Sequence, residues 1–317
     1  MSKIFWRSKE NLLPPSDADF LFQPFKGDPI PFTGEVLSKL PDPCAPIPVI
    51  KRIDKPSKEQ WIETVNRALA QIEQGHLQKV VLARQTIFEL AYAPDPFQIT
   101  AALEKKSQHA SLFCLQFNQK NAFLGASPER LFQRKGVEIL FDAIAGTRPQ
   151  GLRMGEELLA SEKDRREFQF VQDYLEENLH SFCSQPLAFS SLALHQAAHV
   201  QHLFSQGKGI LSPGISDQMI LNRLHPTPAV CGTPKREATE WIHMEEPFCR
   251  NLYSGVIGWS SPTESDWTVA IRSCFLSGST ACLYTGTGIV AGSDPEKEWD
   301  ELESKLGLYS EIFQCGH

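Results

Sequence analysis

The 317-residue sequence lacks closely spaced cysteine pairs. None of its eight cysteines belongs to a C-x-x-C motif, and they lie far apart at Cys44, Cys114, Cys183, Cys231, Cys249, Cys274, Cys282 and Cys315. Structural zinc sites and disulfide-rich scaffolds both depend on cysteines at short, regular spacings. The sequence therefore argues against both classes, and we expect reduced thiols, as in a cytoplasmic protein.

Long apolar runs and an excess of basic residues are also missing. No stretch approaches the roughly 18 consecutive apolar residues of a membrane-spanning helix, and the start, MSKIFWRSKENLLPPSD, has no apolar signal-peptide core. The formal net charge of −7 provides no general positive field for nucleic acid or an anionic membrane. We expect a cytoplasmic protein with neither partner, although a small anionic ligand in a local pocket remains compatible with this charge.

The composition is that of a folded protein, with 41% hydrophobic and 22% charged residues. Residues 1–55 are rich in proline, as in LLPPSDADF and LPDPCAPIP, which predicts turns and edge strands. We expect this short segment to pack on a main body formed by residues 56–317.

The main body is predicted to mix long strands with separate helices. Ser57 and Gln60 can form a capping box before a helix that ends at Gly75. A second helix is expected at 155–181 and strands at 267–291. Further strands are predicted at KVVLARQTIFEL, SLFCLQF, AFLGASPERLFQ and VEILFDAIAG. This pattern favours an α+β fold with large, mainly antiparallel sheets.

Two predicted helices carry carboxylates on one face. In SEKDRREFQF, Asp164 and Glu167 lie three residues apart beside an apolar stripe. Near the end of the chain, Glu298, Glu301 and Lys305 share one helical stripe. Facing carboxylates would offer the hard oxygen ligands that Mg²⁺ prefers. The alternative is an ordinary array of solvated charges, and the spacing does not decide between the two.

Nine segments resemble, in family order, the motifs of the chorismate-binding enzymes. This family includes isochorismate synthases, salicylate synthases and the large subunits of anthranilate and aminodeoxychorismate synthases. The segments are QKVVLAR (78–84), GASPERLF (125–132), AIAGTRPQG (143–151), SEKDRREF (161–168), VQHLFS (200–205), LHPTPAVCG (224–232), LYSGVIGW (252–259), TVAIRSC (268–274) and GTGIVAGSDPEKEW (286–299). The resemblance implies the family fold, a two-layered core of large, mainly antiparallel sheets with helices packed outside.

The resemblance also implies an acid and a base. Lys79 would be the general base that activates a water for attack at C2 of chorismate. Glu129 would be the general acid that protonates the departing C4 hydroxyl. A positioned acid or base typically accelerates such a reaction by roughly 10² to 10⁴. We therefore expect the pKa of Glu129 to be raised.

The same resemblance implies a Mg²⁺ site and a carboxylate-binding site. Glu167 and Glu298 would be the principal metal ligands, with Asp164 and Glu301 close by, and Mg²⁺ would hold the C1 carboxylate of chorismate. Arg272 and Tyr253 would bind the enolpyruvyl carboxylate, because a guanidinium matches a carboxylate with two hydrogen bonds. The remaining positions implied to bind substrate are Gly146, Thr147, His202, Ala229, Gly288 and Lys305.

Each of these residues has a plainer alternative. A strand lysine usually faces solvent, an arginine often pairs with a surface acid, and a histidine can be satisfied within a core. One departure from the family pattern is Phe168, where relatives commonly place a histidine after the metal-binding glutamate. The segment before Ser57 is also shorter than in many relatives.

Two positions indicate which chorismate reaction to expect. A lysine at 79 resembles members that use water, whereas the anthranilate branch characteristically has glutamine there. Ala229 resembles isochorismate synthases, while salicylate-forming and amine-transferring relatives tend to have threonine or serine near it. The resemblance thus points to an isochorismate synthase, acting as a monomer in menaquinone or siderophore biosynthesis. A salicylate synthase and a non-catalytic chorismate-binding module remain the alternatives.

Overall fold

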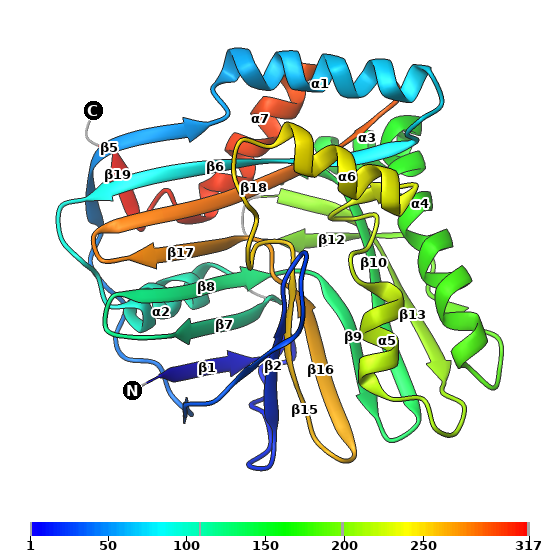
Figure 1. Cartoon of the computed structure of the whole chain (residues 1–317), viewed down its shortest axis with the longest axis horizontal. Coiled ribbons are helices and arrows are strands. Elements are labelled where there is room, and N and C mark those ends of the chain that lie inside the picture. The colour runs from blue at the N-terminus through cyan, green and yellow to red at the C-terminus, as the bar shows by residue number, and fades with distance from the viewer. Residues whose placement is uncertain (1, 108, 198–199, 316–317) are drawn as a thin grey trace.

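The computed structural model describes every residue except 1, 108, 198–199 and 316–317. Two large sheets form the core and the helices lie outside them, as predicted for an α+β fold (Figure 1). The helices are α1 Lys58–Glu73, α2 Pro96–Lys106, α3 Leu152–Ala160, α4 Glu162–Leu179, α5 Asp217–Leu224, α6 Lys235–Glu245 and α7 Pro295–Leu306, with 3₁₀ turns η1 His180–Phe182 and η2 Gly307–Tyr309. None of the helices in the described part of the chain has the length and apolar character needed to cross a membrane.

The larger sheet has ten strands, in the order β19-β5-β6-β18-β17-β8-β7-β1-β4, with β14 beside β6. Neighbours are antiparallel except for the pairs β1–β4 and β5–β19. The strands are β1 Lys3–Arg7, β4 Glu35–Leu37, β5 Ile47–Lys55, β6 Lys79–Leu90, β7 Ser111–Gln116, β8 Asn121–Ser127, β14 Gly232–Thr233, β17 Ser273–Ser277, β18 Thr280–Val290 and β19 Phe313–Cys315.

The second sheet has nine strands, in the order β11-β13-β10-β9-β16-β15-β2-β3, with β12 also paired to β13. All of its described pairs are antiparallel. The strands are β2 Asp19–Gln23, β3 Ile30–Phe32, β9 Arg130–Lys135, β10 Glu138–Pro149, β11 Ala188–Phe189, β12 Ala193–Ala197, β13 Val200–Ile210, β15 Val256–Ser260 and β16 Glu264–Val269.

Strands from residues 1–55 join both sheets. β1 pairs with β7 in the larger sheet, and β2 pairs with β15 in the second. Trp6 and Phe22 are buried in one apolar cluster together with residues of β8 and β15. The division of the chain at residue 55 remains a prediction, but the early strands share their core with the main body.

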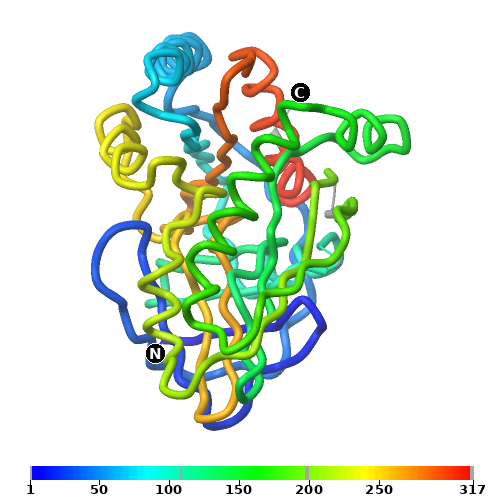
Figure 2. The backbone as a smooth tube through the Cα atoms, turned by 90° about the vertical axis from the view of Figure 1, so that its right-hand side faces the viewer, coloured from blue at the N-terminus to red at the C-terminus, as the bar shows by residue number. Residues whose placement is uncertain are grey.

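Helices α1 and α7 cover the strands that later form one wall of the site. The predicted capping box starts α1, because Ser57 accepts from the Gln60 N–H while the Gln60 side chain accepts from the Ser57 N–H. The indole rings of Trp61 and Trp299 pack between the two helices with centroids 6.3 Å apart. Figure 2 shows α1, α6 and α7 gathered at one end of the molecule.

The single helix predicted at 155–181 is wrong, since the structure has two helices, α3 and α4, with a break at Ser161. Ser161 has an extended backbone with ψ 116° and its hydroxyl accepts from the Asp164 N–H. A serine that hydrogen-bonds to the backbone competes with helix continuation and favours a new N-terminus. As a result, Asp164 and Glu167 lie in the first two turns of α4.

Candidate active site

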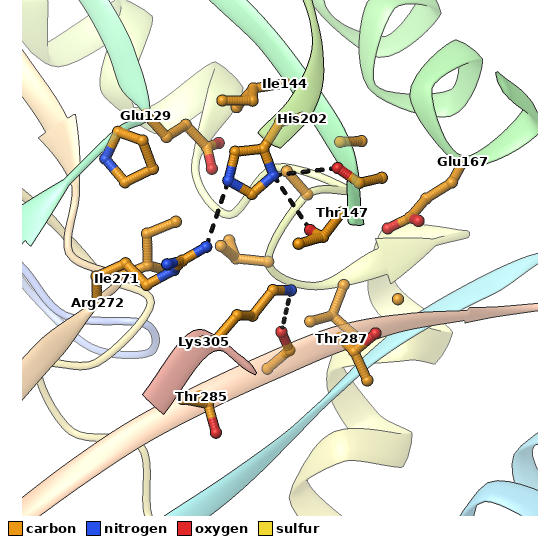
Figure 3. A pocket seen from close by; sticks show the side chains of 18 of the residues that line it. Glu129, Ile144, Thr147, Glu167, His202, Ile271, Arg272, Thr285, Thr287 and Lys305 are labelled. Atoms are coloured by element: carbon orange, nitrogen blue, oxygen red, sulfur yellow. Dashed lines mark hydrogen bonds between the residues drawn. The ribbon is translucent and has the colours of Figure 1, made fainter. Parts of the chain in front are cut away.

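A pocket of about 640 Å³ lies between strands of the two sheets and the helices α4 and α7. Every residue predicted to bind substrate lines this pocket, together with Glu129 and Glu167. Figure 3 shows the side chains of Thr147 from β10, His202 from β13, Glu167 from α4 and Lys305 from α7 converging on one space. The sequence motifs, scattered over more than two hundred residues, are therefore neighbours in the fold. The roles assigned to the individual residues remain predictions.

A β-bulge in β10 provides hydrogen-bond partners for His202. The register of β10 against β13 shifts between Ala145 and Thr147, and Gly146 at the shift has φ +69°. Glycine adopts this left-handed conformation without a Cβ penalty. His202 Nδ1 lies 3.0 Å from the Gly146 carbonyl oxygen and 3.1 Å from Thr147 Oγ1. Bulge and imidazole thus form one hydrogen-bonded unit (Figure 3).

His202 in turn orients Arg272. Burial holds the pKa of His202 well below its usual value, and the positive charge of Arg272 lowers it further. A neutral imidazole that donates from Nδ1 to Gly146 has its Nε2 available as an acceptor. Arg272 Nη2 lies 3.3 Å from that nitrogen and donates to it. The histidine therefore holds the guanidinium without neutralising it.

Arg272 is a buried cation that forms no ion pair with any residue the structure describes. Burial lowers the pKa of its guanidinium to about 10. Its backbone has φ 51°, and its carbonyl oxygen accepts from Tyr309 Oη at 3.0 Å and from the Ala126 N–H at 3.2 Å. A buried charge without a partner is costly, so an anionic ligand at this place would be favoured.

Tyr253 lines the pocket near this arginine. Its ring stacks on Tyr284 with centroids 5.0 Å apart. A Cβ on Gly286 would lie 2.6 Å from the Tyr253 hydroxyl oxygen, so glycine at 286 leaves the room that this hydroxyl occupies. Tyr253 and Arg272 therefore present a hydroxyl and a guanidinium to the same pocket.

Glu129 lies in the loop between β8 and β9 with its side chain buried in the pocket wall. Its carbonyl oxygen accepts from Thr268 Oγ1 at 2.5 Å and from the Val269 N–H at 3.0 Å, which fixes the loop to β16. Burial raises the pKa of its carboxyl to about 8, against the opposing charge of Lys79. The expected rise in this pKa is confirmed, and the carboxyl holds a proton at neutral pH.

Lys79 opens β6 and is fully buried, unlike most strand lysines. Its Nζ lies 3.1 Å from Glu167 Oε1. A Cβ on Gly288 would lie 2.2 Å from that same oxygen and 2.9 Å from Lys79 Cε. The glycine in GTGIVAG therefore provides the space in which the lysine and the glutamate meet, and Lys79 lies just behind the pocket wall that Gly288 and Glu167 form.

The remaining predicted metal ligands lie beside the pocket. Glu298 and Glu301 line an adjoining groove of about 1100 Å³, which shares Thr147 with the pocket. Thr287 Oγ1 lies 2.6 Å from Glu298 Oε2 and 2.9 Å from Glu301 Oε1. Asp164 is buried next to Gly146 at the base of α4. Glu167 thus lies beside Gly288, Asp164 beside Gly146, and Glu298 and Glu301 beside Thr287, and these three neighbours all line the pocket.

These carboxylates fit a hard divalent cation by their chemistry, since all the ligand atoms are oxygens. Burial raises the pKa of Glu298, and the neighbouring charge of Glu301 raises it further, as expected where negative charge is in excess. Within the described part of the chain, however, no three carboxylate, imidazole or thiolate groups gather closely enough to hold a metal ion. Each carboxylate instead contacts a lysine or an arginine.

Two of the cations on these carboxylates, Lys163 and Arg148, were not predicted from the sequence, whereas Lys305 was placed on the same helical stripe as Glu301. Lys163 contacts Glu298, Arg148 Nη2 lies 2.6 Å from Asp164 Oδ2, and Lys305 Nζ lies 2.7 Å from Glu301 Oε1. Lys163 and Arg148 both occur inside the quoted motifs, SEKDRREF and AIAGTRPQG, so their positions were a usable signal. Phe168, the departure from the family pattern, is buried in the apolar core behind α4.

Comparison with known proteins identifies the family of this chain. The family model described as "Chorismate binding enzyme" matches residues 35–312, which include every predicted site residue. The chain belongs to the chorismate-binding enzyme family. Within this family it is 39% identical over 275 residues to "Isochorismate synthase 2, chloroplastic" of Arabidopsis thaliana, covering 84% of this chain and 49% of that protein.

Bacterial members of the chorismate-binding family are similar over more of their length. The isochorismate synthase MenF of Escherichia coli is 34% identical over 289 residues, covering 89% of this chain and 67% of that protein. Its solved structure, described as the menaquinone-specific isochorismate synthase, matches with a TM-score of 0.87 at 26% identity, covering 98% of this chain and 89% of that one. The chain spans about half the length of the plant relatives it matches.

Proposed function

We propose that this chain is an isochorismate synthase, which converts chorismate to isochorismate by adding water at C2 and releasing the C4 hydroxyl. The observation that carries the proposal is the presence at one pocket of two buried side chains, the Lys79 amine just behind its wall and the Glu129 carboxyl in its wall, whose pKa is raised to about 8. The reaction needs one group to take a proton and another to give one. The names of the similar proteins support the same reaction.

Lys79 is proposed as the base. Its amine would accept a proton from a water molecule while the water oxygen forms a bond to C2. Glu167, 3.1 Å away, orients the lysine side chain within the space left by Gly288. A lysine at this position, in place of glutamine, suits water as the nucleophile.

Glu129 is proposed as the acid. As the C2–O bond forms, both ring double bonds shift and the C4–O bond breaks. The Glu129 carboxyl would give its proton to the departing oxygen, so that one water enters and one leaves. Its raised pKa, about 8, supports this role because an ionised carboxylate has no proton to give.

Chorismate has two carboxylates, and each needs a positively charged group in the pocket. The Arg272 guanidinium, which is held by His202 and forms no ion pair with a described residue, suits the enolpyruvyl carboxylate together with the Tyr253 hydroxyl. When bound, Mg²⁺ supplies positive charge to the ring carboxylate and balances the acidic cluster. The residues that would hold this metal are Glu167 and Glu298, with Asp164 and Glu301 close by.

Two other functions remain to be separated by experiment. A salicylate synthase would form isochorismate and then eliminate pyruvate in the same pocket. Ala229 brings no hydroxyl to the pocket wall, whereas salicylate-forming relatives tend to have one near that position. A binding-only module has no need for a paired acid and base, which disfavours the second alternative.

The deciding experiment is incubation of the purified protein with chorismate, with MgCl₂ or with EDTA, followed by chromatography over time. We expect a stable mixture of chorismate and isochorismate that forms only with Mg²⁺. Accumulation of salicylate and pyruvate would replace the proposal with salicylate synthesis. Chorismate binding without any product under either condition would leave only a binding function.

A further inference from the structure

Lys163 joins the two helices that carry the predicted metal ligands. It is the second residue of α4, and its ammonium contacts Glu298 Oε1 on α7. The glutamate side chain is almost fully buried, with 1% exposure, while the lysine side chain keeps 24% exposure. Lys163 also lines the adjoining groove, so its ammonium stands between open space and the carboxylate.

Each of the four predicted metal carboxylates contacts the side chain of one lysine or arginine. The pairs are Lys79–Glu167, Arg148–Asp164, Lys163–Glu298 and Lys305–Glu301. The positive charges of Arg148, Lys163 and Lys305 offset three of the four carboxylates at this end of the site without a metal. A divalent cation that bound here would therefore have to displace some of the positive charge already present.

Lys163 is the cation best placed to leave. Lys305 also donates to the Gly286 carbonyl oxygen at 2.7 Å, and Arg148 also donates to the Thr147 carbonyl oxygen at 2.9 Å. Lys79 is buried within β6. Lys163 has Glu298 as its one hydrogen-bond partner in the described part of the chain, and its long side chain can swing into the groove at little cost.

We propose that Lys163 is a built-in competitor of the metal, which occupies Glu298 in the metal-free site and is displaced when Mg²⁺ binds. The inference rests on the Mg²⁺ site of the proposed function. It assigns to Lys163 two tasks that no other cation of the cluster combines. The lysine prevents a buried, unpaired Glu298 in the absence of metal, and it weakens the affinity for Mg²⁺.

A purely structural ion pair between α4 and α7 is the alternative, and Mg²⁺ binding without substrate separates the two. Titration of the full-length protein with MgCl₂ in a calorimeter, with no chorismate present, measures the metal alone. In Lys163→Met the competing charge is gone, so we expect Mg²⁺ to bind about tenfold more tightly than in the unchanged protein. Lys163→Arg, which keeps the charge, should stay near the unchanged affinity.

Lys58→Met is a matched control. Lys58 Nζ lies 2.5 Å from Glu296 Oε2, so this pair also links a helix to α7, but both side chains are exposed. The same change of charge at this surface position should leave Mg²⁺ affinity unaltered. Equal tightening in both variants would attribute the effect to overall charge and overturn the proposal.

Thermal unfolding gives a second, independent readout. With EDTA, Lys163→Met should melt at a lower temperature because the buried Glu298 then lacks a cation, and MgCl₂ should restore the loss. Unchanged or weaker Mg²⁺ binding by Lys163→Met would overturn the competitor role alone. If the methionine variant does not fold, Lys163→Gln should show the same tightening. No Mg²⁺ binding by the unchanged protein would overturn the metal site itself, a failure that the chorismate assay would register separately.

Discussion

The two ends of the pocket differ in whether their buried charged side chains form ion pairs. At the end formed by His202 and Arg272, the guanidinium is held by a neutral imidazole and has no carboxylate partner in the described structure. At the other end, carboxylates such as Glu298 and Glu301 each contact a cation. The first end is ready for an anion without rearrangement. The second must exchange one positive charge for another before a metal can bind.

Lys79 lies at the carboxylate end of the pocket, and its replacement should have the largest effect on activity. Lys79→Ala removes the proposed base, so we expect kcat to fall by about 10⁴-fold, the upper end of the range for such a group. Chorismate binding at the Arg272 end should persist, as measured by calorimetry. An unchanged kcat would remove Lys79 from the mechanism.

Replacement of Glu129 tests a side chain whose protonation state is set by burial and not by an ion pair. Its pKa is raised to about 8, so the carboxyl is protonated below that pH and ionised above it. We therefore expect kcat/KM to fall as the pH rises through about 8. Glu129→Gln should lower kcat by about 10² to 10³-fold and abolish this fall.

The exposed Glu138, on β10, supplies the control for Glu129. Glu138→Gln should keep both the rate and the pH profile of the unchanged protein. A Glu129→Gln variant that retains the decline above pH 8 would assign that titration to another group.

Replacement of Glu298 tests the end of the pocket at which the carboxylates contact cations. Glu298→Gln removes one charged metal ligand, and we expect the Mg²⁺ concentration for half-maximal activity to rise about tenfold, since second ligands and waters still hold the ion. Glu296→Gln, an exposed change on the same helix, is the control. An identical metal titration in Glu298→Gln would exclude this residue from the site.

His202 should show the smallest effect because it acts through Arg272. His202→Ala removes one hydrogen bond from the guanidinium, worth about 1 kcal/mol, so we expect KM to rise about fivefold with kcat less affected. His202→Gln, which can still accept from Arg272, should recover part of the loss. A fall in kcat with unchanged KM would contradict a positioning role.

Local patterns were enough to predict much of the fold. The capping box at Ser57 and the apolar stripe of α4 are set by neighbouring residues along one helix, so the sequence contains their full cause. The pocket-lining positions were found by family motifs, because strands from both sheets bring them together and no short-range pattern encodes that meeting.

Other features depend on contacts between distant segments. The Lys163–Glu298 pair joins residues 135 positions apart, and either residue alone is typical of a helix surface. The need for glycine at 288 becomes visible only when Glu167 and Lys79 are in place beside it. The break at Ser161 was missed because helical periodicity continues on both sides of it.

The pairing of β2 with β15 links residues near opposite ends of the chain, with Gln23 opposite Val256. Contacts of such sequence separation form late, since the entropy of closing a long loop must be offset first. Until then β15 has an open edge, and β2 has only the short β3 as a partner. Trp259 and Phe20, which face each other across this pairing, then lack the cluster that buries them. During synthesis, therefore, β2 must wait for most of the protein to be made, and the second sheet is completed only when one of its first strands meets one of its last.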